Sequence, residues 1–386
     1  MTEALNADGF GLYVHWPFCQ AKCPYCDFNS HVAATIDQTR WLDAYLSEIK
    51  RVSSEVSDRV LTSIFFGGGT PSLMPPDTVG RVIEAARAAW PRANDLEITL
   101  EANPTSTEAG RFRGFRDAGV NRVSVGLQSL RDEDLKRLGR LHSAAEGRSA
   151  FLLAREVFPR VSFDLIYARQ FQTLADWRAE LTEALTLAAD HLSLYQLTIE
   201  PGTAFGDRFA RGRLSGLIDD DLGAEMYDLT QELCMANGLP AYEVSNHASD
   251  MAQSRHNLIY WRGGDYAGIG PGAHGRLTLG GIRHATETEL SPIGWLDRLT
   301  RDGTGESQRS VLSLREQAEE YAMMALRLTE GLDRQRFSRM NGSDFKADTL
   351  LHLEELGMIA VTPTRIRATV EGRRLLNAVL RDLLAD

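Results

Sequence analysis

Short apolar runs alternate with longer amphipathic stretches between residues 12 and 197. Runs of about four to eight apolar residues are typical of buried strands, whereas apolar residues at about every third or fourth position are typical of helices. The first pattern predicts strands at Leu12–His15, Val60–Phe66, Leu96–Leu100, Arg122–Gly126, Val161–Tyr167 and His191–Leu197. The second pattern predicts helices at 41–53, 76–90, 105–118, 131–138, 143–157 and 173–188.

Strand and helix therefore alternate six times. Such alternation favours parallel strands that are covered by helices. Each apolar strand ends in a polar or glycine residue, and in barrel enzymes the site lies at the C-terminal ends of the strands. We predict an α/β fold with a partial TIM-like barrel of six βα units, (β/α)6. A doubly wound open sheet is the competing architecture.

The pattern changes after Pro201. A helix is expected at Asp219–Asn237, and a run rich in glycine, histidine and aromatic residues follows from Tyr242 to Arg276. Short amphipathic helices are then expected at 313–328, 333–339 and 343–356, with short strands at 357–359 and 366–370. We predict a barrel over 1–240, a connecting region over 241–302 and a small α+β, winged-helix-like domain over 303–386.

Charge and composition narrow the classes of function. The net charge of −11 argues against binding a phosphate backbone, and no basic stripe marks the C-terminal region as a DNA-binding module. No apolar run approaches the length of a transmembrane helix, and Met1–Phe10 lacks a basic, apolar leader. We therefore predict a cytoplasmic protein with no nucleic-acid partner.

Three of the four cysteines lie close together, at Cys19, Cys23 and Cys26. Thiolates are soft ligands that select zinc or iron–sulfur clusters, and unpaired cysteines fit a reducing compartment. A zinc site needs a fourth ligand, which His15 or His31 would have to supply. Three ligands on a four-iron cluster instead leave one iron open to an outside molecule.

Polar residues and glycines follow several of the predicted strands. Gly67–Thr70 comes directly after one strand, and glycines let the backbone approach a ligand closely. Glu101, Gln128 and Asp164 each end a strand, and three in succession favour one shared pocket over three separate helix caps. Arg140 can bind a carboxylate in a bidentate fork, or be a surface arginine at a helix end.

The CxxxCxxC loop, with its aromatic residues and the later glycine run, resembles the radical S-adenosylmethionine (SAM) superfamily. In that superfamily the three cysteines hold a [4Fe–4S] cluster, and the amino and carboxylate groups of SAM occupy the open iron. Further segments resemble the HemN/HemW branch over nearly the whole chain: Leu12–His15, Phe66–Ser72, Glu101–Pro104, Gly126–Ser129, Leu138–Arg140, Asp164–Tyr167 and Leu328–Gly331.

This resemblance implies two SAM positions and metal ligation by Cys19, Cys23 and Cys26. The first, cluster-bound SAM would contact Tyr13, Gly68 and Glu101. The second would contact Tyr25, Gly69, Thr70, Gln128, Arg140 and Asp164. One segment departs from the family, because Ala168–Thr173 stands where Gly-Leu-Pro-Gly-Gln-Thr is usual. The departure leaves open whether the second position is used.

Two functions compete within that branch. Oxygen-independent coproporphyrinogen III oxidases, which decarboxylate propionates, carry a fourth cysteine just after the triad and a long N-terminal extension. Here Phe28 stands at that position and twelve residues precede Tyr13. HemW haem chaperones resemble the chain more closely, through Cys26–His31, Tyr195–Thr203, Tyr242–Asn246 and the HNxxYW motif His256–Trp261.

The resemblance therefore implies a haem chaperone that binds a [4Fe–4S] cluster, SAM and haem, and transfers haem to an acceptor protein. His256 is the expected haem ligand, and His247 and His274 are alternatives. Imidazole is a common ligand of haem iron, and Tyr260 and Trp261 offer flat apolar surface. The expected partners are a reductant protein and the haem acceptor. Expected acceptors include a protein that associates transiently with the membrane.

Overall fold

One mixed sheet of eleven strands organises residues 9–105 and 109–385, the part of the chain that the computed structural model describes. Seven of these strands form a parallel run in its middle. In spatial order they are β10 (Asp265–Ile269), β1 (Phe10–Trp16), β4 (Leu61–Gly68), β5 (Arg92–Ala102), β6 (Arg122–Gln128), β7 (Arg160–Tyr167) and β8 (His191–Gln196).

The six predicted strands are confirmed as β1 and β4 to β8, but β10 was not predicted. Its sequence, Asp265–Ile269, lies among glycines in the run that the sequence marked only as dense in glycine and aromatic residues. In the structure β10 pairs with β1 on the side opposite β4. The first strand of the chain is therefore buried between two parallel neighbours.

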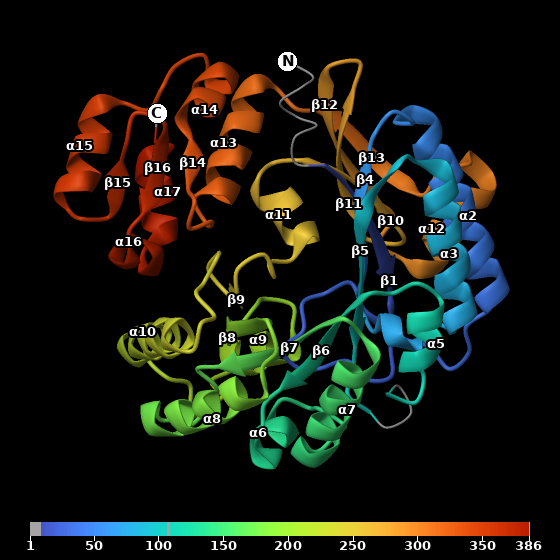
Figure 1. The fold of residues 1–386 in the computed structure, drawn as a ribbon, viewed down its shortest axis with the longest axis horizontal. Coiled ribbons are helices and arrows are strands. Elements are labelled where there is room, and N and C mark those ends of the chain that lie inside the picture. Colours follow the sequence, from blue (N-terminus) through green and yellow to red (C-terminus); the bar gives the residue numbers. More distant parts are fainter. Residues whose placement is uncertain (1–8, 106–108, 386) are drawn as a thin grey trace.

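Helices cover the parallel strands, in the order expected of βα units. They are α2 (Gln38–Glu55), α3 (Pro76–Ala89), α5 (Phe112–Asp117), α6 (Asp132–Arg137), α7 (Ala144–Val157), α8 (Leu174–Leu187) and α10 (Asp220–Ala236). In Figure 1 α2 and α3 lie beside one end of the sheet, and α5 to α8 follow below it. The predicted helices are confirmed, except that residues 106–108 of the one expected at 105–118 lie outside the described residues.

Packing explains why these segments become helices. Val79, Val82, Ile83 and Ala86 share the buried face of α3, at the spacing that an amphipathic helix requires. Capping boxes begin α7, at Ser143 and Glu146, and α8, at Thr173 and Asp176. Each box pairs two backbone N–H groups that the first turn would otherwise leave free.

Antiparallel strands extend the sheet at both ends. On the β10 side these are β11 (His274–Leu279), β12 (Ile282–Thr288) and β13 (Glu306–Val311), and on the β8 side β9 (Asn246–Ala248). The segment 241–302, expected as a connection, thus contributes four strands to the sheet, together with α11 (Arg255–Trp261) and α12 (Pro292–Asp302). The domain boundaries themselves stay a prediction.

The C-terminal part forms a separate module with its own apolar core. It contains α13 (Leu314–Ala325), α14 (Arg334–Asn341), α15 (Ala347–Glu355), α16 (Val370–Arg374) and α17 (Leu376–Leu383). Its sheet has the order β14 (Leu332–Asp333), β16 (Arg365–Ala368), β15 (Ile359–Val361). The predicted helices and two strands are confirmed, whereas β14, α16 and α17 were not predicted. Across the described ranges, no helix combines the length and hydropathy needed to span a bilayer.

Candidate cofactor site

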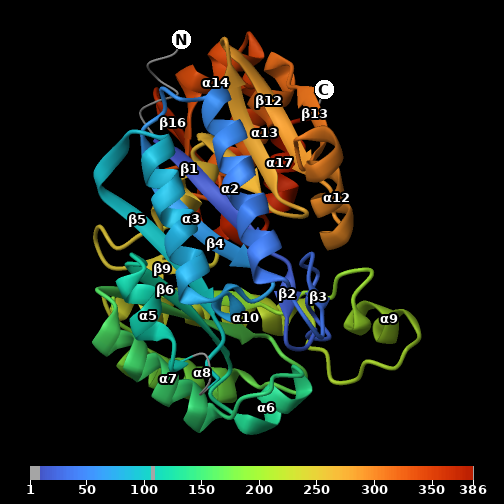
Figure 2. The same cartoon turned by 90° about the vertical axis from the view of Figure 1, so that its right-hand side faces the viewer.

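The cysteine loop begins directly after the central strand β1. β2 (Phe18–Cys19) pairs in parallel with β3 (His31–Val32), and this pairing closes the loop that carries all three cysteines. Cys19, Cys23 and Cys26 are half-buried. Figure 2 shows the loop at one end of the sheet, beside the projecting helix α9 (Ala204–Ala210). The Phe205 N–H donates to the Pro24 carbonyl over 2.8 Å, so α9 is attached to this loop.

Hydrogen-bond donors point at the sulfur atoms. Thr70 Oγ1 donates to Cys19 Sγ over 3.3 Å, and Arg140 Nη1 donates to Cys23 Sγ over 3.5 Å. Burial raises the pKa of Cys19 and of Cys26, while such donors favour the thiolate. The thiolate is the form that binds a metal, so in residue type the three cysteines match the ligand set of an iron–sulfur cluster. Among the described residues, no three His, Cys, Asp or Glu side chains are grouped as they would be around a single metal ion.

Asn103 joins these two donors to each other. Its Nδ2 donates to Thr70 Oγ1 over 3.1 Å, and its Oδ1 accepts from Arg140 Nη2 over 2.6 Å. Arg140 Nη2 also donates to the Gly126 carbonyl over 3.1 Å. Sequence reasoning did not assign Asn103 to the site. The sequence signal that could have identified Asn103 is its position directly after a predicted strand, two residues beyond Glu101.

A cavity of about 370 Å³ opens next to the cysteine loop. It brings together Tyr13, Gly68 and Glu101, the three residues expected to contact a cluster-bound SAM, and it also reaches Tyr260 of the HNxxYW motif. The other lining residues are His15, Phe28, Asn29, Tyr266, Gly272 and His274. Residues from β1, β4, β5, α11 and β10 therefore share one cavity.

Glu101 is the acidic group of this cavity. Burial, and then the nearby Asp164 carboxylate, raise the pKa of Glu101 to about 8, although the Gly68 N–H opposes this shift. Its carboxyl group is therefore largely neutral at pH 7. A cationic group placed beside it would favour the carboxylate, because an opposite charge stabilises the ionised form.

The residues expected around a second SAM do not share that cavity. Thr70 and Arg140 are hydrogen-bonded to Cys19 and Cys23, as described above. Asp164 accepts from Ser124 Oγ over 3.0 Å, and burial raises the pKa of Asp164. Tyr25 lies against Phe205 of α9, with ring centroids 6.5 Å apart.

Gly69 and Gln128 owe their positions to the backbone. A side chain at Gly69 would lie 2.7 Å from the Phe18 carbonyl oxygen, so glycine permits the two segments to meet. Gln128 follows an irregularity in β6 and has a φ of 67°. Such a backbone is uncommon for a residue other than glycine, and it clusters at functional sites.

The segment Ala168–Thr173, which departs from the pattern expected for the family, is anchored by buried side chains. Ala168 and Phe171, which replace the two glycines usual there, have φ values of 57° and 62°. Arg169 is 3% exposed; it pairs with Glu180 and, over 2.8 Å, with Asp134. The replacement residues therefore keep the left-handed backbone that suits glycine and add a buried ion pair beside it.

His256 is enclosed by its neighbours. Its ring is 1% exposed and stacks on Phe65, with centroids 5.0 Å apart. Nδ1 is 2.8 Å from Ser63 Oγ, and Nε2 is 2.6 Å from the Tyr260 hydroxyl. Burial lowers the pKa of His256 to about 3, so the imidazole is neutral. Both of its nitrogens have hydrogen-bond partners.

The two alternative histidines differ in their surroundings. His274 is exposed, lines the cavity, and makes no side-chain hydrogen bond within residues 9–105 and 109–385. His247 is buried on β9, where burial lowers its pKa to about 4, and it does not line the cavity. Of the three, His274 has the most accessible ring nitrogens.

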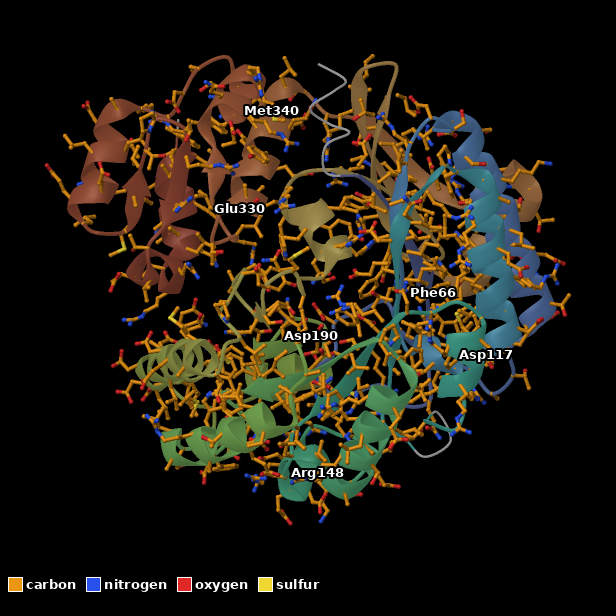
Figure 3. All side chains as sticks on the ribbon, in the orientation of Figure 1. Phe66, Asp117, Arg148, Asp190, Glu330 and Met340 are labelled. Atoms are coloured by element: carbon orange, nitrogen blue, oxygen red, sulfur yellow. The ribbon has the colours of Figure 1, made fainter. Side chains whose placement is uncertain are left out.

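The C-terminal module holds the end of the helix that carries His256. Arg336 Nη1 donates to the Arg262 carbonyl over 2.7 Å, and its Nη2 donates to the Gly263 carbonyl over 3.0 Å. Arg262 pairs with both carboxylate oxygens of Glu330 at 2.9 and 3.0 Å. Glu330, labelled in Figure 3, lies where the module meets α11. These contacts attach the C-terminal end of α11 to the C-terminal module.

Two family models match the chain. The radical SAM superfamily model covers residues 13–182, and the HemN C-terminal domain model covers residues 312–375. The first range contains the cysteine loop, the later part of β1 and every strand from β2 to β7, and the second begins just before α13 and covers most of the C-terminal module.

Full-length relatives share about a third of the residues. The chain is 38% identical to the heme chaperone HemW of Escherichia coli, with 97% of this chain and 98% of that protein covered. It is 32% identical to HemW of Bacillus subtilis, with 97% and 99% covered. It is also 38% identical to the mitochondrial radical S-adenosyl methionine domain-containing protein 1 of Bos taurus, over 100% of this chain and 89% of that one.

A solved structure shares the fold. Coproporphyrinogen III oxidase (HemN) from Escherichia coli, a radical SAM enzyme, aligns with a TM-score of 0.82 over 98% of this chain and 90% of that one. The sequence identity is 20%, so this likeness concerns the fold alone.

Proposed function

Because this chain belongs to the HemW family within the radical SAM superfamily, we propose that it is a haem chaperone. It binds haem, a [4Fe–4S] cluster and SAM, and it transfers the haem to an acceptor protein. The observation that carries this proposal is the cavity beside the cysteine loop. It is lined both by Tyr13, Gly68 and Glu101, the residues expected to contact SAM, and by Tyr260 of the HNxxYW motif.

Cys19, Cys23 and Cys26 are proposed as the cluster ligands. Tyr13, Gly68 and Glu101 are proposed to contact the SAM bound at the cluster. A cationic group of SAM placed beside Glu101 would lower the raised pKa of Glu101 and so favour its carboxylate form. When reduced, a cluster of this kind can pass one electron to the sulfonium of SAM. The second set, Tyr25, Gly69, Thr70, Gln128, Arg140 and Asp164, stays a prediction.

The aromatic cavity wall supports haem as the cargo. Tyr13, Tyr260 and Tyr266 supply ring surface for a flat macrocycle. We propose His256 as the iron ligand, which requires the Tyr260 hydroxyl to leave Nε2. His274 is the alternative, since its ring is already accessible at the same cavity.

An anaerobic haem titration of cluster-reconstituted protein, followed by its Soret band, tests this proposal. The expected result is saturation near about one haem per chain in the wild-type protein. His256→Ala and His274→Ala identify the ligand, because only the variant that lacks it should bind more weakly. His284→Ala, on β12 and outside the lining of the cavity, is the matched control.

The outcomes separate the candidate functions. Absence of specific haem binding in the wild-type protein would overturn the chaperone proposal. The likeness in fold to HemN would then make coproporphyrinogen turnover, with SAM and a reductant, the next assay. Equal binding in all variants would retain the chaperone and move the iron ligand to His247 or to a residue other than histidine.

The remaining expectations belong to the same proposal. We propose that the six βα units curve into a partial barrel and that the C-terminal module is winged-helix-like. The protein is proposed to act in the cytoplasm, with a reductant protein and a haem acceptor as partners.

A further inference from the structure

Four hydrogen bonds connect Cys19 to Cys23 through three polar side chains. Thr70 donates to Cys19 Sγ and accepts from Asn103, and Arg140 donates both to Asn103 and to Cys23 Sγ. The donors at both ends of this chain of bonds point at sulfur. Hydrogen bonds in a chain polarise one another, so the network acts as one unit.

The segment that carries Arg140 lies directly against the cysteine loop. Gly139 has a φ of 68°, and a side chain there would lie 2.7 Å from the ring of Pro24. Glycine therefore allows the close approach that brings the guanidinium to Cys23. The Gly126 carbonyl accepts from the same guanidinium and fixes its orientation.

The guanidinium fork is already occupied by protein atoms. Nη1 contacts Cys23 Sγ, and Nη2 contacts Asn103 Oδ1 and the Gly126 carbonyl. Only Nε is buried without a hydrogen-bond partner among the described residues. A bidentate carboxylate would use one N–H of Nη2, so Arg140 would have to release Asn103 or the Gly126 carbonyl.

We propose that Thr70, Asn103 and Arg140 are positioning residues of the iron–sulfur cluster rather than contacts of a second SAM. This inference rests on the proposed cluster at Cys19, Cys23 and Cys26. Hydrogen bonds to cluster sulfurs and a buried positive charge stabilise the reduced cluster, which carries one more electron. The network thus raises the reduction potential and leaves this chain with one SAM.

The test measures the midpoint potential of the reconstituted cluster without SAM, by a redox titration followed by electron paramagnetic resonance. Arg140→Gln removes the charge, and Thr70→Val removes the hydroxyl donor at nearly constant volume. Each variant should lower the ratio of reduced to oxidised cluster at a fixed potential. For Arg140→Gln we expect the ratio to fall by about tenfold. For a one-electron couple that is a shift of about 59 mV.

Two further variants show whether the effect is specific. Arg140→Lys keeps the charge without the fork and should recover part of the shift. Arg137→Gln removes an exposed charge from the end of α6, beside the same segment, and should leave the potential unchanged. An equal shift in Arg137→Gln would mean that net charge, and not the network, sets the potential.

The inference and the proposed function fail in different ways. An unchanged potential in both Arg140→Gln and Thr70→Val, at full iron content, would overturn the inference and leave the chaperone proposal intact. If Arg140→Gln fails to hold iron, Thr70→Val alone decides. Equilibrium dialysis with labelled SAM should give about one SAM per chain, and a second SAM that Arg140→Gln abolishes would also overturn the inference. Failure of the wild-type protein to assemble a cluster would contradict the proposed function itself.

Discussion

Ala168 carries a left-handed backbone that its side chain disfavours. Its φ is 57°, and in this conformation the Cβ of an L-residue crowds the following carbonyl oxygen. The residue lies in the segment that departs from the pattern expected for the family, in which glycine stands at this position. The surrounding structure must therefore hold it in place, at a cost to the folded state.

Ala168→Gly is expected to stabilise the protein. Relief of the steric clash is worth about 1–2 kcal/mol, and the greater freedom of glycine in the unfolded chain offsets part of this gain. We expect the free energy of unfolding in urea to rise by about 1 kcal/mol. Ala150→Gly, inside helix α7, is the control and should lower it by at least about 1 kcal/mol. A loss of stability in Ala168→Gly would contradict the strain argument.

Glu101→Gln is expected to change how stability depends on pH. The pKa of Glu101 is raised to about 8, whereas an unfolded glutamate titrates near about 4.3. Between these values the folded protein keeps a proton that the unfolded chain has lost, so stability falls as pH rises, by up to about 1.4 kcal/mol per pH unit. Glutamine has no proton to lose and should flatten this slope.

Urea unfolding at several pH values between 5 and 8 measures the slope. The stability of the variant, relative to wild type, should increase as pH rises. Glu133→Gln, an exposed residue of α6, should leave the slope unchanged. Parallel curves for Glu101→Gln and wild type would show that the carboxyl group ionises normally in the folded protein.

The sequence indicated which residue types would form the site but not their partners. The spacing of Cys19, Cys23 and Cys26 is a local pattern, so it could be recognised in one stretch of chain. The link from Asn103 to Thr70 and Arg140 joins the ends of two strands, β4 and β5, to the segment that follows α6, and a local sequence pattern cannot predict such a long-range link. The same holds for His256, whose partner Ser63 is far away in the sequence.

At the scale of elements, Glu180 on α8 joins two loops that follow neighbouring strands. Its Oε1 accepts from Ser129 Oγ and from the Leu130 N–H, each over 2.7 Å. Its Oε2 accepts from Arg169, and from Gln172 over 3.4 Å. The loops after β6 and β7 are therefore held by a single buried carboxylate.

Glu180→Gln is expected to destabilise the protein strongly. It leaves Arg169 buried with less compensation for its charge, and breaking a buried pair in this way costs about 3–5 kcal/mol. Glu183→Gln, one turn further along α8, breaks half-exposed pairs and should cost about 1 kcal/mol or less. Urea unfolding of both variants measures the difference in stability. Equal losses of stability would mean that burial does not strengthen the contribution of Glu180 relative to that of Glu183.

Elements with strong periodicity could be predicted from the sequence, and the others could not. The six apolar strands and their helices each carry their own hydrophobic pattern. By contrast, β13 is almost entirely exposed and β14 has only two residues, so neither has an apolar run to mark it. The order of the strands in the sheet could not be predicted from local patterns either, because strands that pair, such as β1 and β10, lie far apart in the sequence.

At the scale of the whole molecule, ion pairs connect the C-terminal module to the rest of the protein. Glu320 on α13 pairs with Arg276 on β11 at 2.9 Å, and Arg374 on α16 pairs with Asp228 on α10 at 2.5 Å. The module has its own apolar core. Its coupling to the main sheet therefore depends in part on these charged contacts.

Removing both pairs should loosen this coupling. In the double variant Asp228→Asn with Glu320→Gln, we expect the calorimetric unfolding peak to broaden or divide, with a loss of about 1–2 kcal/mol in total. Glu319→Gln, which breaks a pair within α13 itself, is the control and should leave the peak shape unchanged. A single, equally sharp peak in the double variant would show that apolar contacts alone couple the module to the sheet.

The place of β10 beside β1 has a consequence for biosynthesis. β4 can pair with β1 once residue 68 has left the ribosome, but the other edge of β1 must wait for Asp265–Ile269. At about 5–20 residues per second, synthesis of the intervening chain takes roughly 10–40 s. Throughout that interval the nascent chain presents an open strand edge next to its cysteine loop, and such edges promote aggregation. Slower translation lengthens this exposure.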